Sequence, residues 1–192
     1  MYVLTVDQRG SRRDVDRVAD LLDELRDAPM LRKFERTAGD EVQAVSDDPG
    51  TVVDLALALL DRNHWSIGIG IGPVETPLPP RPAPVASRVR ARPNCRRARQ
   101  ERTRPYRCRR ADTECASDVD AALTLLATIV LRRTDHGVEA VALARTGLSQ
   151  AEIATRLAIS KQAVSQRLLT AGWQAEFAGR ALLHRLLERA DR

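Results

Sequence analysis

Six polar side chains in the last third of the chain have types that could hydrogen-bond to DNA. The amide of glutamine pairs with adenine, lysine and arginine reach guanine or phosphate, and serine adds short hydrogen bonds at a helix start, where the dipole favours phosphate. On one helix they would lie opposite the apolar residues Val164 and Leu168. We therefore expect a DNA-reading face made of Ser160, Lys161, Gln162, Ser165, Gln166 and Arg167.

Two short helices joined by a tight turn, within residues 148–169, would position this face. Ser149 and Glu152 have the spacing of a capping box, which predicts the start of the first helix, and Ser160 is placed to cap the second. The alternative is an ordinary helical hairpin whose outer face is merely polar. Apolar residues at helical spacing predict one shared core, made of Ile153, Ala154, Leu157, Val164 and Leu168.

The segment resembles the helix-turn-helix of bacterial regulators and the DNA-reading end of sigma factors. That pattern runs Gln-x-x-Ile-Ala-x-x-Leu-x-Ile-Ser-x-x-x-Val-Ser-x-x-Leu, and the chain has every fixed residue of it from Gln150 to Leu168. One difference is Ala158, where many relatives have a turn glycine, so we expect a turn that tolerates a Cβ atom. The resemblance implies a protein whose partner is double-stranded DNA.

Length and composition set the limits around this motif. The chain has 192 residues, of which 43% are hydrophobic and only 3% aromatic, so one large or two small domains must be packed by aliphatic side chains. Its start becomes charged too early for a signal peptide and no apolar run reaches the length of a membrane span, so we expect a cytoplasmic protein with no membrane partner. Three cysteines without a Cys-x-x-Cys pair predict reduced thiols: Cys95, Cys108 and Cys115.

The net charge of +5 comes from one segment of the chain. Residues 81–110 contain twelve arginines and one acid, which leaves nineteen basic and twenty-five acidic residues elsewhere. Because this Pro/Arg/Ala-rich stretch lacks helical or strand periodicity, residues 79–112 are predicted to be a disordered linker. Two origins stay open. The composition is what a shifted reading frame produces in GC-rich DNA, and it is also that of a basic linker that helps to hold DNA through phosphate charge.

Residues 1–78 alternate between strand and helix patterns. Runs typical of strands occur at 2–6, at 34–45 around a turn and at 65–71, and apolar stripes at helical spacing occur at 15–25 and 52–60. The order β-α-β-β-α-β predicts the split βαβ arrangement of a ferredoxin-like domain. The expected fold class is α+β, in which this domain precedes a small all-α helix-turn-helix domain at 113–192.

The N-terminal part is similar to the palm of nucleotidyl cyclases and GGDEF-type diguanylate cyclases. The resemblance lies in Asp7 at the end of the first strand, the turn Gly39-Asp40-Glu41 and the Gly-Ile-Gly strand at 68–70. It implies that Asp7, Asp40 and Glu41 hold Mg²⁺ and a nucleotide triphosphate, since carboxylates at strand ends make a hard-oxygen site. Much of the rest of the cyclase pattern is missing, and Gly-Asp is also ordinary turn chemistry, so we expect no catalysis and no resident cofactor.

Four segments together resemble the SatD family: residues 6–11, 37–44, 68–72 and the C-terminal helix-turn-helix. The resemblance implies a cyclase-like half joined to a DNA-binding half. Our leading hypothesis is a transcriptional regulator whose degenerate cyclase-like domain senses a ligand or mediates association. The alternatives are a Mg²⁺-dependent nucleotide-binding or nucleotide-converting protein and a non-enzymatic scaffold.

Three further helices are predicted in the C-terminal part. Apolar spacing predicts helices over 118–131 and from Val138 to Gly147, which we expect to pack behind the DNA-reading pair. A last helix from Trp173 has a broad apolar face, either for the domain core or for a homodimer interface. The scattered histidines are expected to be surface or capping residues: His64, His136 and His184.

Overall fold

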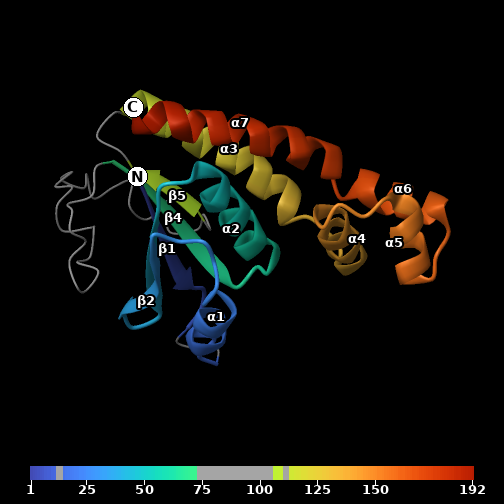
Figure 1. The fold of residues 1–192 in the computed structure, drawn as a ribbon, viewed down its shortest axis with the longest axis horizontal. Coiled ribbons are helices and arrows are strands. Elements are labelled where there is room, and N and C mark those ends of the chain that lie inside the picture. The colour runs from blue at the N-terminus through green and yellow to red at the C-terminus, as the bar shows by residue number, and fades with distance from the viewer. Residues whose placement is uncertain (12–14, 73–105, 110–112) are drawn as a thin grey trace.

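The N-terminal part of the chain supplies four strands of a five-stranded sheet, and a later segment supplies the fifth (Figure 1). The computed structural model describes residues 1–11, 15–72, 106–109 and 113–192. The strands lie side by side in the order β2-β3-β1-β4-β5, with every neighbouring pair antiparallel except β4 and β5, which are parallel. Their bounds are β1 Tyr2–Gln8, β2 Arg32–Ala38, β3 Glu41–Ser46, β4 Trp65–Ile71 and β5 Tyr106–Arg109.

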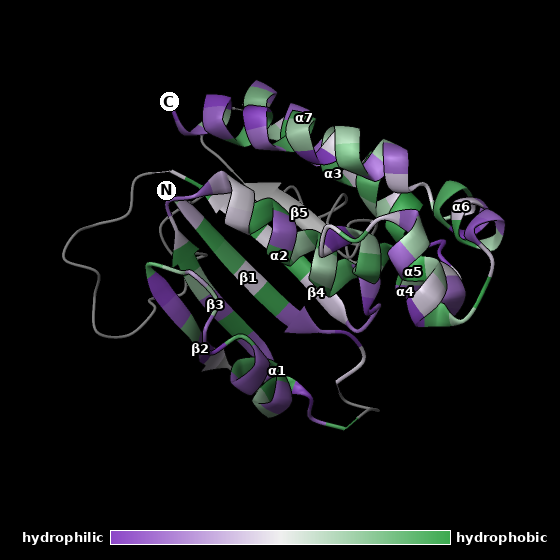
Figure 2. Ribbon diagram, turned by 45° about the vertical axis from the view of Figure 1, so that its right-hand side comes forward, coloured by the Kyte–Doolittle hydropathy of each residue, from purple (hydrophilic) through white to green (hydrophobic). Residues whose placement is uncertain are grey.

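Alternation along the strands directs one face of the sheet into the core. In β4, Trp65, Ile67, Ile69 and Ile71 are buried whereas the residues between them are half-buried, as expected for a strand with one covered face. The central strand β1 pairs with β3 on one side and β4 on the other, so that Asp7 lies opposite Glu41 and opposite Ser66. Figure 2 shows hydrophobic positions along β1 and β4 beneath α2.

The sheet strands are connected by two helices, α1 (Val18–Glu24) and α2 (Pro49–Asp61). The start of α2 follows from its sequence, because the Asp48 carboxylate accepts hydrogen bonds from the backbone N–H groups of Gly50 and Thr51, and Pro49 occupies the first turn. The Thr51 hydroxyl also donates to the Asp48 carboxylate. This hydrogen bond, followed by those from the backbone, holds the pKa of Asp48 below its usual value. The apolar face of α2 packs into the core with the sheet.

Two long helices from the C-terminal part complete this first core. Helix α3 (Thr113–Val130) and helix α7 (Trp173–Asp191) pack against each other and against α2 (Figure 1). Gly179 permits the close approach, because a Cβ atom there would lie 2.4 Å from the Leu126 side chain. Helix α3 contributes Val119, Ala122, Leu123, Leu126, Ala127 and Val130 to the core of the sheet, and α7 contributes Leu183, Leu187 and Ala190.

A second, smaller core holds the three remaining helices together. These are α4 (Asp135–Arg145), α5 (Gln150–Leu157) and α6 (Lys161–Thr170), which gather at one end of the long helices (Figure 1). The predicted split between residues 1–78 and 113–192 therefore differs from the observed packing. Helices α3 and α7 belong to the sheet core, and the second core is made by α4–α6 with their flanking residues.

The broad prediction of an α+β chain, with a four-stranded antiparallel N-terminal sheet followed by a helical region, is confirmed. The linker prediction for 79–112 differs at residues 106–109, which pair with β4 as strand β5. The other residues of that range, including Cys95, lie outside the described residues. The two proposed origins of the segment are therefore not addressed by the structure. Within the described part of the chain, no helix is long and apolar enough to cross a membrane.

Candidate nucleic-acid interface

The capping box predicted at the start of α5 is present. The backbone N–H of Glu152 donates to the Ser149 hydroxyl at 3.3 Å, and the Glu152 carboxylate accepts from the backbone N–H of Ser149 at 2.8 Å. A further hydrogen bond from the Ser149 hydroxyl lowers the pKa of Glu152. Two N–H groups that a helix start would leave unsatisfied therefore have partners.

The turn between α5 and α6 differs from the expected conformation. Ala158 has φ 53° and ψ 41°, which is the left-handed region where glycine is common. The turn therefore keeps the geometry that glycine favours and places an alanine Cβ in it, at a cost of about 1–2 kcal/mol. The backbone N–H of Ala158 donates to the carbonyl of Thr155, and the backbone N–H of Ile159 donates to the carbonyl of Ala154. These two hydrogen bonds end α5.

The apolar stripe of the two helices forms a buried core with α4. Ile153, Val164 and Leu168 are buried as predicted, as is Ala154, while Leu157 packs against them at the edge. Helix α4 adds Ala140 and Val141. The helix-turn-helix is thus a three-helix arrangement in which α6 is supported from behind by both α4 and α5.

The six residues predicted for the reading face all lie on α6 or at its cap. Ser160 caps the helix by accepting from the backbone N–H of Ala163 at 3.1 Å. Lys161, Gln162, Ser165 and Gln166 are exposed, and Gln166 donates to the Thr170 hydroxyl at 3.3 Å. Arg167 is half-buried and lies 3.5 Å from the Glu139 carboxylate of α4.

An exposed apolar residue lies among these polar ones. Leu169 is 69% exposed, and its spacing from Gln162 and Ser165 places it on the same outward side of α6. On a helix that lies in a major groove, an apolar side chain in this position would contact the methyl group of thymine. The sequence contained a signal for this position. Leu169 follows Gln162 by seven residues and falls outside the helical spacing of the buried stripe of Val164 and Leu168.

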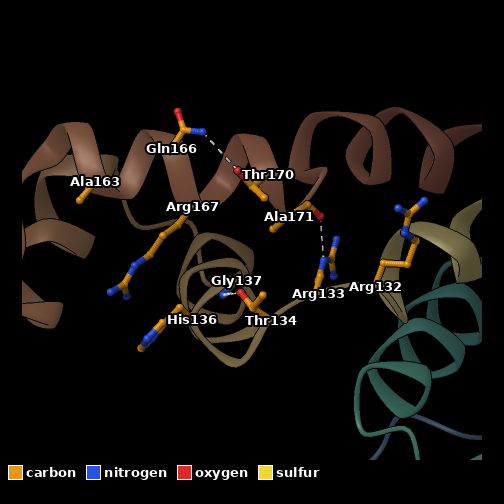
Figure 3. Close-up of a pocket in the computed structure, with 10 residues that line it drawn as sticks. All are labelled: Arg132, Arg133, Thr134, His136, Gly137, Ala163, Gln166, Arg167, Thr170 and Ala171. Carbon is orange, nitrogen blue, oxygen red and sulfur yellow. Dashed lines mark hydrogen bonds between the residues drawn. The ribbon is translucent and has the colours of Figure 1, made fainter.

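Sequence reasoning also missed a basic hollow beside α6. It has a volume of about 380 Å³ and lies between α6 and the start of α4 (Figure 3). Cationic or ionisable side chains line it from the α3–α4 connection, from α4 and from α6. They are Arg132, Arg133, His136 and Arg167.

A buried cluster of charges connects α4 with α2 and α7. Glu176, at the start of α7, has no exposed side-chain area and accepts hydrogen bonds from Arg133, Arg145 and Arg180. Asp61, at the end of α2, pairs with Arg133 and Arg145. Burial alone would raise the pKa of Glu176, but the arginine charges and hydrogen bonds hold it below its usual value. The same two acids raise the pKa of Arg145 against the effect of burial.

The three predicted metal ligands are brought near one another at one end of the sheet. Burial, then the charges of Asp40 and Glu41, raises the pKa of Asp7. The Glu41 carboxylate accepts from the Thr37 hydroxyl at 2.6 Å and from the Gln43 amide at 2.9 Å. Among the described residues, no group of three or more His, Cys, Asp or Glu side chains is arranged to hold a metal ion.

The three histidines singled out in the sequence lie in separate parts of the structure. His64 follows α2 and is exposed, and His184 lies 3.8 Å from Glu188 on α7. His136 borders the same hollow as the predicted reading residues Gln166 and Arg167. Cys115 is a free thiol, as predicted.

Comparison of the chain with protein-family models, with curated proteins and with solved structures gave no match. A capped two-helix pair has a buried inner stripe and an outward face of polar side chains, next to a basic hollow.

Proposed function

We propose that the protein binds double-stranded DNA sequence-specifically through α6 and acts as a transcriptional regulator. The observation that carries the proposal is the division of α6 into two sides. Val164 and Leu168 are buried, whereas Lys161, Gln162 and Ser165 are exposed on a helix whose start is capped by the Ser160 side chain. Such a helix fits the major groove with its N-terminal residues against base edges.

The chemistry of the face suggests its readout. The amide of Gln162 suits adenine, Lys161 suits guanine or phosphate, and Leu169 suits the methyl group of thymine. Because Ser160 already accepts a hydrogen bond within the cap, its contribution would be to fix the start of α6. The reading side chains therefore extend from a preorganised backbone.

Selection of duplexes from a random pool tests this proposal. The wild-type protein is expected to enrich one sequence, and Gln162→Ala is expected to relax the preference at one or two base pairs, worth about 1–3 kcal/mol. Gln174→Ala, which changes an exposed glutamine on α7, is the matched control and should select the wild-type sequence. Enrichment of no sequence by the wild-type protein contradicts the proposal.

We further propose that α7 forms a homodimer contact. Phe177 is 65% exposed and its ring lies 6.1 Å from that of Trp173, while Leu182 is also exposed. The inner side of α7, with Leu183 and Leu187, is already buried in the sheet core. Two copies joined in this way would present two reading helices to paired half-sites, and the molar mass in solution measures it.

The N-terminal domain is proposed to be the ferredoxin-like, cyclase-related half of a cytoplasmic SatD-type protein. The strand order β2-β3-β1-β4 with antiparallel neighbours supports this topology. In this proposal the domain senses a ligand or mediates association and has no catalytic residues.

A second candidate function, binding of a Mg²⁺ nucleotide, is favoured by one observation, the position of Asp7 directly opposite Glu41 where β1 and β3 pair. Like charges held together are stabilised by a divalent cation. The test is the thermal unfolding midpoint with Mg²⁺ and ATP or GTP. A rise that Asp40→Asn abolishes supports this function, and no rise excludes it under those conditions.

A further inference from the structure

The last turn of α6 contains a hydrogen bond between two side chains of that helix. The amide nitrogen of Gln166 donates to the hydroxyl oxygen of Thr170, four residues further on, at 3.3 Å. Residues four apart on a helix lie on the same face, one above the other, and Figure 3 shows the two side chains directed toward each other along α6. Both residues are exposed, so the bond orients a surface side chain.

Gln166 lies on the side of α6 opposite the buried stripe. It is two positions from Val164 and two from Leu168, which places it about 160° round the helix from each of them. Those two residues are buried in the core with α4 and α5. The spacing of four residues from Gln162 puts the two glutamines on the same outward side. Gln166 is therefore among the side chains that would enter a major groove in the proposed binding mode.

The turn that carries Thr170 is attached to the buried charges beside it. The carbonyl of Ala171, the next residue, accepts a hydrogen bond from the guanidinium of Arg133 at 2.9 Å. That guanidinium is buried and pairs in turn with the buried carboxylate of Glu176. Thr170 therefore offers Gln166 a partner on a segment of backbone that a buried ion pair supports.

The hydrogen bond decides which groups of the amide remain available to a base. A glutamine amide has one carbonyl oxygen and two N–H groups. Thr170 accepts one N–H, and Figure 3 shows the amide oxygen of Gln166 on the side away from Thr170. One acceptor and one donor are then left side by side. In the major groove adenine offers the matching pair, a donor at N6 and an acceptor at N7, whereas guanine offers two acceptors, N7 and O6.

We propose that Thr170 is a positioning residue for base recognition, which holds the amide of Gln166 so that it pairs with adenine and rejects guanine. The inference rests on the proposed DNA-binding function and assigns one base to one side chain. Without the Thr170 hydroxyl, the amide is free to rotate and to offer its NH₂ group to the acceptors of guanine. Ordering such a side chain on binding weakens the affinity by about two- to tenfold, and Thr170 orders it before DNA arrives.

The main test compares the duplexes that variants select from a random pool. The wild-type protein is expected to prefer adenine over guanine at one position by about fivefold or more, and Gln166→Ala identifies that position by losing the preference. Thr170→Val keeps the shape of the side chain but lacks the hydroxyl. It should lower the ratio of adenine to guanine at that position about two- to tenfold and leave the other positions unchanged. Thr170→Ser keeps the hydroxyl and should keep the ratio.

The matched control is Thr128→Val, the same change at an exposed threonine of α3 whose hydroxyl donates to the carbonyl of Thr124. It should leave the selected sequence unchanged. If Thr170→Val also leaves the ratio unchanged while Gln162→Ala relaxes the preference elsewhere, the inference is overturned and the proposed function stands. A preference for guanine at the position that Gln166→Ala relaxes has the same meaning. If the wild-type protein enriches no sequence, the proposed function fails and the base preference inferred here fails with it.

A second measurement tests the hydrogen bond itself in the DNA-free protein. By NMR relaxation, the side-chain NH₂ group of Gln166 is expected to be more rigid on the picosecond-to-nanosecond timescale than that of Gln174, an exposed glutamine of α7. Thr170→Val should make Gln166 as mobile as Gln174, whereas Thr170→Ser should not. Equal mobility of the two NH₂ groups in the wild-type protein would contradict the inference independently of any binding to DNA.

Discussion

Arg145, the last residue of α4, forms an ion pair with Asp61, the last residue of α2, across 84 positions of sequence. The end of α2 is an unfavourable place for a carboxylate, because the helix dipole is negative there. Arg145 and Arg133 offset this by pairing with Asp61 and with the buried Glu176. The orientation of α4, and with it the hollow beside α6, depends on these charges.

Removing Glu176 should destabilise the fold strongly. Glu176→Ala leaves three arginines without their shared buried carboxylate, and breaking such a buried pair costs about 3–5 kcal/mol. Urea unfolding measures the loss. Glu188→Ala, which removes an exposed glutamate of α7, should change the free energy of unfolding by less than about 0.5 kcal/mol.

The same residue predicts a pH dependence. The pKa of Glu176 is lowered in the folded state, so its contribution to stability is present above the ordinary glutamate pKa and is lost as pH falls through the folded value. Glu176→Gln should lack this acid-dependent component. If the wild-type protein and Glu176→Gln lose the same amount of stability as the pH falls below the ordinary glutamate pKa, the proposed role of the charge network is contradicted.

Asp7→Asn should stabilise the protein at neutral pH. The pKa of Asp7 is raised in the folded state by burial and then by Asp40 and Glu41, so the ionised form weakens the fold at pH values above its folded pKa. The gain should vanish below the ordinary aspartate pKa, where Asp7 is protonated in both states. Thermal midpoints of both proteins across this pH range measure it, and a gain that persists in acid would point to a cause other than charge.

Glycine should be better than alanine in the helix-turn-helix turn. Ala158→Gly removes the strain of a Cβ atom in the left-handed conformation, but it also raises the conformational entropy of the unfolded chain. The net effect should be a gain of roughly 0.5–1 kcal/mol in the free energy of unfolding. In contrast, Ala142→Gly, at an exposed position inside α4, should lose about 1 kcal/mol. Equal losses in both variants would show that the turn is not strained.

Glu139→Gln should strengthen DNA binding. Glu139 lies 3.5 Å from Arg167 and adds negative charge beside the candidate interface. Its removal frees Arg167 for DNA, with an expected gain of about two- to fivefold in affinity at low salt. The change should shrink as salt rises, and Glu188→Gln, on α7, should leave the affinity unchanged.

The helix-turn-helix could be predicted because its signals are local. Ser149 and Glu152 are three residues apart, and the buried positions repeat within two turns, so neighbouring residues specify both caps and the inner stripe. The conformation of Ala158 was not predicted, since the packing of α5 and α6 imposes a turn that the alanine alone disfavours.

Longer-range relationships could not be derived in the same way. Apolar periodicity showed that 118–131 and the last helix each bury a face, but it cannot tell which core receives that face, and both helices pack on the sheet. Arg132 and His136 join α6 only because the chain turns between α3 and α4. Their approach depends on tertiary packing, which no spacing in the sequence encodes.

In the proposed function, the outward side of α6 reads base pairs. The most direct measurement is the affinity of the double variant Gln162→Ala/Arg167→Ala for the duplex selected by the wild-type protein, compared with a random duplex, at physiological salt. We predict that the ratio of the two affinities falls at least about tenfold while the thermal midpoint is maintained. A double variant that binds both duplexes with the wild-type ratio would contradict the account.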